Sequence, residues 1–380
     1  MLPHHSKLSK TSNNADDEAN TEDLVSNLPH NLTDKILQLL PLSEAAKLGV
    51  LSKTWHNNWS CITSLRFDYN FGVKFRKKRK LDWERFSSVI NNILLLHQGP
   101  LPEFLPYIPK SRTTNDDKEM TLNLRRWIFF VSRNGVKKIT LCNSYVLRVL
   151  SMPSHIFICK DLEELILHNF FLVPPPTGFM GFVHLSKLEL ISIQFKLDML
   201  RSLIESCPEL ASLDIRQYKP LKGLVIDAPK LEKLCLCGAF GILDVNNVPK
   251  LAQLQLQLTG LGLTSLNVKL VTIIKNLATS CPSIKTLNIS VDASNDVVVQ
   301  RNFDYDNDFK LGYLCEVNFK RVQGSFKELK LIEYLLSVSN VLEKLLLQFA
   351  KIDDSLQLKV QKQLNGFQRA SPKAIIIFVE

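Results

Sequence analysis

The chain has 380 residues, 45% of them apolar and 22% charged, and lysine plus arginine exceed aspartate plus glutamate by 10. This length is too great for one compact core, and the ordinary globular composition excludes a largely disordered chain, so we expect several domains or one elongated array. The basic excess is spread along the chain, which allows an acidic partner but does not indicate nucleic-acid binding.

Residues 1–22 are rich in Ser, Asn, Asp and Thr, and they predict a disordered tail. Residues 1–23 contain no apolar signal-peptide core. The longest apolar run, Ala374 to Val379, is far shorter than the ~20 residues that a membrane-spanning helix requires. We therefore expect a protein of the cytoplasm, the nucleus or both.

Residues 23–62 predict a small module of three short helices. One helical stripe is formed by Leu32, Ile36, Leu37 and Leu40. Pro41 ends that helix, and Ser43 and Ser52 are suitable N-caps for two more. A module this small exposes more apolar surface than its own core can cover, which favours a partner-binding patch.

The next segment, Lys74–Lys80, carries six basic residues around one phenylalanine. We expect a solvated loop, with a nuclear-import signal as the alternative, since the run lacks the interleaved aromatic residues typical of nucleic-acid contacts. A helix is expected from about Trp83 to Leu96. The Pro-rich, polar stretch from Gln98 to Asn123 is interpreted as a loop.

From Arg125 onward the chain repeats the pattern L-x-x-L-x-[LI]. Clear copies begin at residues 162, 185, 210, 231, 251 and 284, and looser ones at 136, 314 and 342. The first four spacings, of 23, 25, 21 and 20 residues, match the period of leucine-rich repeats, and the longer spacings of 33, 30 and 28 indicate insertions on the helical side.

A longer self-match shows what one repeat contains. Residues 200–215 align without gaps on residues 274–289, and residues 332–347 form a degenerate third copy. In the first two copies, apolar residues at helical spacing precede a Cys-Pro that ends the helix, and a strand of period two follows. Each unit has one apolar face that only a neighbouring unit can cover, so the units are expected to stack into a curved solenoid.

Residues between the leucines of each strand face away from the core and would line the concave sheet, which is the usual binding surface of a solenoid. The candidate target-binding residues there are Glu189, Asp214, Arg216, Lys233, Gln255 and Asn288. Their mixture of both charges and amides suits a protein segment as the ligand. A generic polar face without a ligand is the alternative for any one of them.

The module at residues 23–62 resembles an F-box. The match rests on Leu28-Pro29, Ile36-Leu37, Leu40-Pro41 and Val50-Leu51-Ser52-Lys53 followed by Trp55. The resemblance implies binding to an adaptor of the Skp family and, through it, to a cullin. The adaptor-binding residues it implies are Leu28, Pro29, Ile36, Leu37, Leu40, Pro41, Val50, Leu51 and Trp55. Packing within the module is the alternative for some of them.

The remaining chain resembles the plant family that joins an F-box to leucine-rich repeats and a C-terminal FBD region. The matching segments are 65–68, 126–128, 314–319, 341–345 and 369–372. This implies an α/β fold with a three-helix F-box (23–62), a curved leucine-rich-repeat solenoid with a parallel sheet (63–310) and an FBD-like region that continues the repeats (311–380). Ser337-Val338-Ser339 departs from the family's more alanine-like stretch.

The resemblance implies a non-enzymatic substrate receptor of a ubiquitin ligase, which captures an unknown target protein on its repeats. A non-degradative scaffold and a small-ligand sensor remain alternatives. Enzyme motifs are absent from the sequence. The eight cysteines form no C-x-x-C pair and have no close histidine cluster, so we expect buried reduced thiols, no metal and no cofactor.

Overall fold

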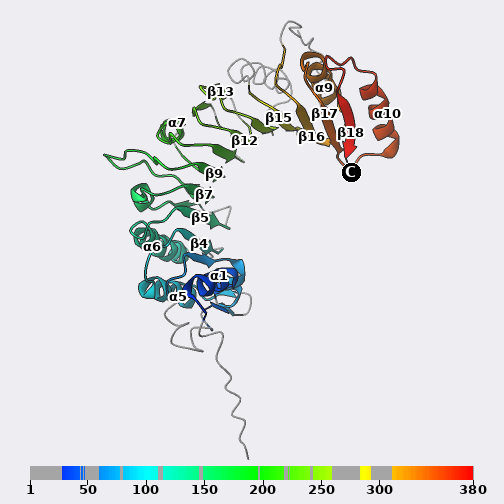
Figure 1. The fold of residues 1–380 in the computed structure, drawn as a ribbon. Helices are drawn as coiled ribbons and strands as arrows, with labels where there is room; N and C mark the ends of the chain where they lie inside the picture. The colour runs from blue at the N-terminus through cyan, green and yellow to red at the C-terminus, as the bar shows by residue number, and fades with distance from the viewer. Residues whose placement is uncertain are drawn as a thin grey trace, which may run out of the picture.

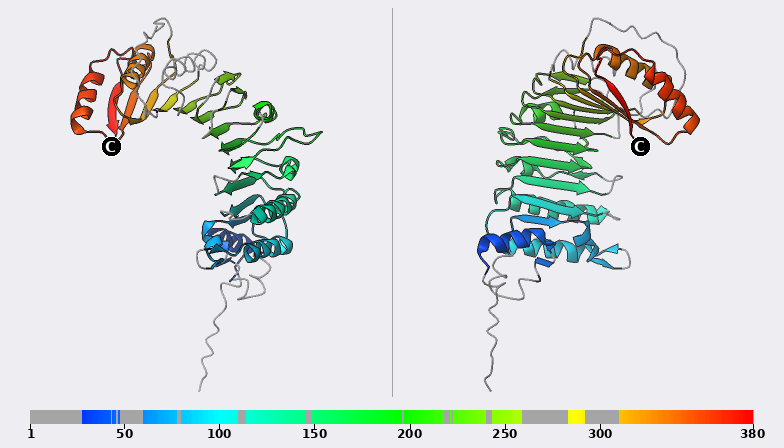
Figure 2. Two further views of the ribbon diagram at one scale, coloured as in Figure 1. Left: turned by 180° about the vertical axis from the view of Figure 1, so that it is seen from behind. Right: turned by 45° about the vertical axis from the view of Figure 1, so that its right-hand side comes forward.

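A computed structural model describes residues 28–42, 44–45, 47, 60–77, 80–109, 114–144, 149–195, 197–217, 221, 223–239, 243–258, 283–291 and 310–379. In this part of the chain, twelve parallel strands form one sheet whose strand order follows the sequence. The sheet curves into an arch with α6, α7 and α9 on its outer side (Figures 1 and 2). The predicted solenoid with a parallel sheet is therefore confirmed.

The strands of this sheet are β1 (Ser64–Phe67), β4 (Glu103–Ile108), β5 (Lys138–Asn143), β7 (Glu164–His168), β9 (Lys187–Ile191), β10 (Ser212–Arg216), β12 (Lys233–Gly238), β14 (Gln253–Leu258), β15 (Thr286–Val291), β16 (Glu316–Val322), β17 (Lys344–Phe349) and β18 (Ile375–Val379). The helices are α1 (His30–Leu39), α4 (Tyr69–Val73), α5 (Trp83–Leu96), α6 (Thr114–Val131), α7 (Leu197–Glu205), α9 (Phe326–Val338), α10 (Asp354–Asn365) and the 3-10 helix η1 (Ser154–Ile158). Short paired strands are β2 (Arg76–Lys77) with β3 (Lys80–Leu81), β6 (Leu150–Ser151) with β8 (Phe170–Phe171), and β11 (Leu224–Asp227) with β13 (Leu243–Asn246).

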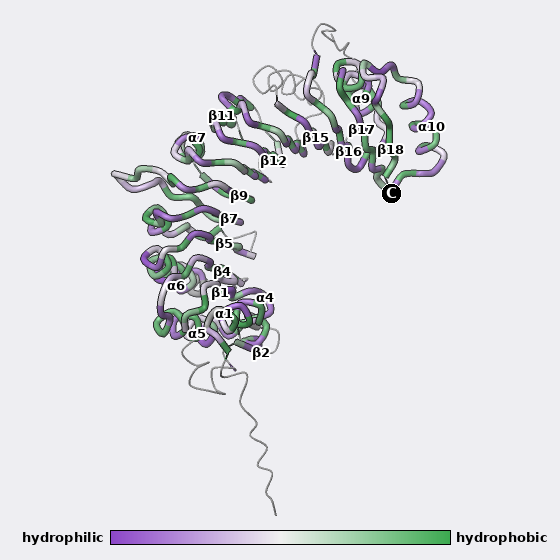
Figure 3. The backbone as a smooth tube through the Cα atoms, in the orientation of Figure 1, coloured by the Kyte–Doolittle hydropathy of each residue, from purple (hydrophilic) through white to green (hydrophobic). Residues whose placement is uncertain are grey.

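The period-two pattern of the repeats sets the register of the sheet. Leu188 pairs with Leu213, and Leu213 with Leu234, and all three are buried beneath the sheet. Residues between the leucines are mostly part-exposed on the other face. Figure 3 shows that both hydrophobic and hydrophilic residues occur along the strands. The predicted order of helix, stop and strand is found in α7–β10 and again in α9–β17. Residues 274–282 of the second copy lie outside the described residues.

The expected loop from Gln98 to Asn123 is wrong, because this stretch contains β4 and the first half of α6. Its alternating burial is that of a strand, with Phe104 and Ile108 buried. Pro106 is tolerated because it pairs with Phe67 of β1 while the ladder to β5 is interrupted at Leu105 and Pro106. The helix expected at Trp83–Leu96 is confirmed as α5.

The basic run is also more ordered than the loop that we expected. Asp68 caps the short helix α4 by accepting a hydrogen bond from the Phe71 N–H, and β2 and β3 then pair as an antiparallel ribbon. The Arg76 guanidinium lies 4.8 Å from the centre of the Tyr69 ring. Residues 78–79 lie outside the described residues.

Candidate functional site

The first candidate surface is α1, which presents two different faces. Leu37 is buried and belongs to the same hydrophobic core as Ile62 and Leu65, so it is not available as a partner contact. Ile36 is 37% exposed and Leu39 is 86% exposed on the solvent side. A helix that packs into the core with one side and exposes apolar side chains on the other is typical of protein-docking elements.

The ends of α1 follow from the prolines that flank it. Pro29 precedes the first helical residue, and Leu40 adopts an extended backbone before Pro41, which ends the helix as the sequence predicts. Both prolines are exposed, while Leu28 and Leu40 are half-buried.

The implied adaptor-binding residues therefore divide into four groups. Pro29, Ile36 and Pro41 are exposed, and Leu28 and Leu40 are half-buried. Leu37 belongs to the core. The remaining three, Val50, Leu51 and Trp55, lie outside the described residues. Leu39 was missed by the sequence reasoning, although it follows Ile36 at the helical spacing i, i+3 that would have identified it.

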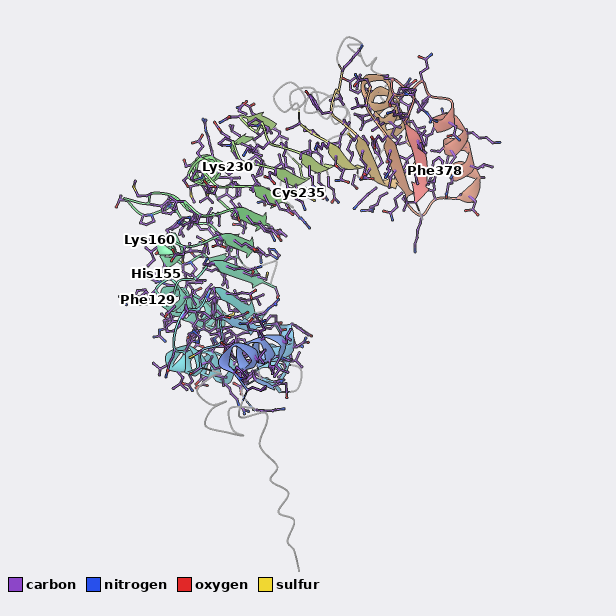
Figure 4. The ribbon with its side chains drawn as sticks, viewed as in Figure 1. Phe129, His155, Lys160, Lys230, Cys235 and Phe378 are labelled. Carbon is purple, nitrogen blue, oxygen red and sulfur yellow. The ribbon has the colours of Figure 1, made fainter. Side chains whose placement is uncertain are left out.

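The second candidate surface is the concave side of the sheet. Glu189, Asp214 and Gln255 lie in one cross-strand row, on β9, β10 and β14, and Asn288 of β15 continues it. Arg216 and Lys233 lie on β10 and β12 beside that row. The six predicted residues thus lie on five strands of one face. Cys235, which Figure 4 labels on the inner side of the arch, lies between Asp214 and Gln255 in the same row and is buried.

Many charges on this face are satisfied within the molecule. Asp214 accepts two hydrogen bonds from Arg216, from Nε at 2.9 Å and from Nη2 at 2.7 Å. This pairing, above all, holds the pKa of Arg216 above its usual range. Glu164 contacts Lys138 at 3.1 Å and Lys187 at 3.7 Å on the flanking strands. A ligand on this face would therefore either contact these ion pairs while they stay intact or break them to form its own.

A chain of three polar groups crosses β5, β7 and β9. The Cys142 sulfur lies 3.3 Å from His168 Nδ1, and His168 Nε2 lies 2.9 Å from Glu189 Oε1. A thiol, an imidazole and a carboxylate in this order resemble an activated cysteine nucleophile with its base, but burial raises the pKa of the Cys142 thiol to about 11. The thiol therefore stays protonated near neutral pH, where a nucleophile would need to be a thiolate. These contacts hold the three side chains in place on the concave face.

The expectation of buried thiols holds for only three of the seven described cysteines, since Cys61 is exposed and Cys142, Cys237 and Cys315 are part-buried. Cys159, Cys207 and Cys235 are buried, and burial raises the pKa of each thiol, to about 12, 11 and 12 respectively. None of the seven described cysteines is in a disulfide. Cys281 lies outside the described residues. Within the described residues no group of three or more His, Cys, Asp or Glu could hold a metal ion, and no described helix is long and apolar enough to cross a membrane.

Comparison with known proteins adds two family matches and several relatives. The F-box domain model matches residues 25–62, and the model described as "FBD-associated F-box protein At5g56370, LRR repeats" matches residues 124–275. An Arabidopsis thaliana F-box/FBD/LRR-repeat protein, At1g13570, is 27% identical over 94% of this chain and 99% of its own length.

Two further Arabidopsis thaliana relatives match in part. F-box/FBD/LRR-repeat protein At2g04230 is 29% identical over 57% of this chain and 47% of its own length, and F-box/LRR-repeat protein At3g26922 is 26% identical over 62% and 75%. Among solved structures, the Leptospira interrogans LRR protein LIC12759 covers 83% of this chain and 95% of its own at 14% identity, with a TM-score of 0.27.

Proposed function

The chain belongs to the plant F-box/FBD/LRR-repeat family, and we propose that it is the substrate-recognition subunit of a Skp–cullin–F-box ubiquitin ligase. In this role the F-box binds a Skp-family adaptor and through it a cullin, while the repeats capture a target protein for ubiquitination. Proteins of this family are typically non-catalytic adaptors. The proposed compartment is the cytoplasm, the nucleus or both.

The observation that supports docking most directly is the exposed apolar side of α1 inside the segment that matches the F-box model. The helix is anchored by Leu37, and the Gln38 side-chain amide donates a hydrogen bond to Thr63 Oγ1 at 2.9 Å, next to β1. A docking helix held this way is fixed relative to the repeats, so a target on the concave face would be presented at a defined distance from the ligase.

The target side of the proposal is the concave sheet, where the proposed contacts are Glu189, Asp214, Arg216, Lys233, Gln255 and Asn288. Continuous parallel pairing from β9 to β15 supports this, because it places these side chains on one rigid surface. Interfaces concentrate their energy in a few central residues, so a group of changes is expected to matter where single changes do not.

The docking proposal is tested by replacing Pro29 and Ile36 together with Ala. Both side chains are exposed, so we expect the double variant to keep the solenoid folded and to lose at least about tenfold in adaptor affinity, as truncated interface anchors typically do. Adaptor pull-down with the full-length chain measures the loss, and its circular-dichroism spectrum checks the fold.

Lys35→Ala, an exposed change on the same helix that removes no apolar contact, serves as the matched control. Adaptor binding that survives the double substitution would show that α1 is not the docking element. Co-purification of a cullin, followed by identification of proteins that accumulate when the chain is removed, then tests the ligase role itself.

A further inference from the structure

The last strand of the sheet gives the concave face an apolar end. In β18, Ile376 and Phe378 pair with the buried Leu345 and Leu347 of β17 and share their core-facing side. The Phe378 ring, labelled in Figure 4, stacks on Phe349 with centroids 5.9 Å apart. Because side chains alternate along a strand, the other three residues of β18 project from the concave side.

These three residues are Ile375, Ile377 and Val379, which are 60%, 36% and 40% exposed. Leu346 of β17 is the cross-strand neighbour of Ile377 and is half-buried on the same face. We call these four residues the terminal apolar patch. A contiguous group of exposed branched side chains at the end of a polar binding face marks a site that a partner covers.

Two lysines border the patch. Lys344 pairs across the strands with Ile375, and Lys320 pairs with Gln348, which in turn pairs with Val379. Within the described residues neither lysine has an ion pair within 4.0 Å, in contrast to the neutralised pairs on β5 to β10. The acid on the concave side of β16, Glu316, instead accepts a hydrogen bond from Asn318 at 2.8 Å.

We propose that the terminal apolar patch, with Lys320 and Lys344, is the anchor site for a segment of the target that presents apolar side chains flanked by carboxylates. This inference rests on the proposed function and narrows its target to one chemical class. The apolar side chains supply the buried centre of the contact, and the two ammonium groups select acidic flanks and disfavour basic ones.

The dimensions of the patch set the length of the segment. From Ile375 to Val379 the strand rises about 13 Å, and β17 lies about 5 Å from β18. An extended segment of about four to five residues covers this area, and its flanking residues then lie within reach of the lysines. A second copy of the chain is a poorer occupant, since a patch-to-patch contact about a twofold axis would bring the four lysines of the two copies together.

The test uses the full-length chain and two fluorescent peptides measured by anisotropy. Both carry the same core of four leucine and valine residues, one flanked on each side by two aspartates and the other by two lysines. We expect the aspartate peptide to bind about tenfold or more tightly than the lysine peptide, and Ile377→Asp to weaken it by a further tenfold or more. The double variant Lys320→Glu/Lys344→Glu is expected to reverse the preference.

The control is Lys359→Glu/Lys362→Glu, which makes the same charge change at two exposed lysines of α10, outside the concave face, and is expected to keep the preference for aspartate. Failure of the aspartate peptide to bind, or a preference that the Lys320/Lys344 variant leaves unchanged, overturns the proposal. So does a dimer that Ile377→Asp dissociates, as measured by light scattering.

Adaptor pull-down on the same variants separates this inference from the proposed function. If the adaptor binds and the peptides do not, the anchor-site proposal alone is refuted. If the wild-type chain does not bind the adaptor but keeps the peptide preference, the proposed ligase role is refuted and the anchor-site proposal is not.

Discussion

At the scale of single residues, Leu213 and Asp214 are neighbours in the chain with opposite environments. Leu213 is fully buried between Leu188 and Leu234, while Asp214 is on the concave face beside Arg216. Leu213→Asp buries an unpaired charge and is expected to cost more than ~4 kcal/mol, enough to unfold the array locally or entirely. Asp214→Ala removes a part-exposed ion pair and should cost less than ~1 kcal/mol.

Thermal unfolding of both variants followed by circular dichroism measures the difference. Comparable melting temperatures would mean that the strand faces are exchanged, since a slip of one residue moves every side chain to the other face.

The faces of these residues were predictable from the sequence because period two is a local property of the strand. The ion pair within β10 was not, although Asp214 and Arg216 are two residues apart and therefore on the same face. Whether Arg216 reaches back to Asp214 or outward to a partner depends on side-chain torsions and on the neighbouring strands. Cys235, in the same cross-strand row as Asp214, is buried as we expected of the cysteine thiols.

At the scale of elements, α9 begins with a capping box whose carboxylate is buried. Glu328 accepts hydrogen bonds from the N–H groups of Gln323 and Ser325, at 3.1 and 2.9 Å, while the Ser325 hydroxyl caps the Glu328 N–H. Burial raises the pKa of Glu328, and the hydrogen bonds only partly oppose this. A carboxyl with a raised folded-state pKa contributes stability that is fully present below its unfolded pKa and is lost as pH rises through its folded pKa.

Glu328→Gln cannot titrate, so the stability of the wild-type chain relative to this variant is expected to fall over the pH range above about 4, the unfolded-state pKa of a glutamate. Urea midpoints of both proteins across that range provide the measurement, with Glu343→Gln as the control for loss of an exposed acid. A wild-type advantage that grows with pH would contradict the assigned direction of the shift. Ser325→Ala removes the reciprocal hydroxyl and should cost about 1 kcal/mol at any pH in the range.

Elements with strong periodicity were predictable, and β4 with the start of α6 was not. Taken from the sequence alone, Pro106 argues against a central strand. Such a strand hydrogen-bonds to a neighbour on each side, and proline has no backbone N–H to donate. Its place in the sheet becomes possible once β1 and β5 are present, since the missing donor coincides with the gap in the ladder to β5. In α6 the buried Trp127 donates a hydrogen bond to Asn91 of α5 at 2.7 Å. Such tertiary partners are not visible in a local window.

At the scale of the whole molecule, the arch separates its two candidate surfaces. The basic run lies at the same end as α1, where Lys74 approaches Glu44 within 3.6 Å, while the concave strands β9 to β15 lie further along the curved sheet (Figure 1). The separation of a docking end from a capture face could be anticipated from the order of the segments in the chain. The curvature could not, because it depends on how each repeat packs against the next.

This separation predicts that changes to the concave face remove the target while changes to the basic run do not. Ala at Asp214, Arg216, Lys233 and Gln255 together eliminates one ion pair, the ammonium group of Lys233 and one amide near the centre of the sheet, so we expect the set of proximity-labelled interactors to be lost. Adaptor binding and the circular-dichroism spectrum should persist. Ala at Lys77, Lys78, Arg79 and Lys80 should at most alter nuclear distribution, because Lys77 of β2 and Lys80 of β3, the described members of this set, lie at the same end of the sheet as α1 (Figure 3). Loss of the interactors in the basic-run variant, with the concave variant unaffected, would place target selection at the docking end and favour an electrostatic mode of recognition.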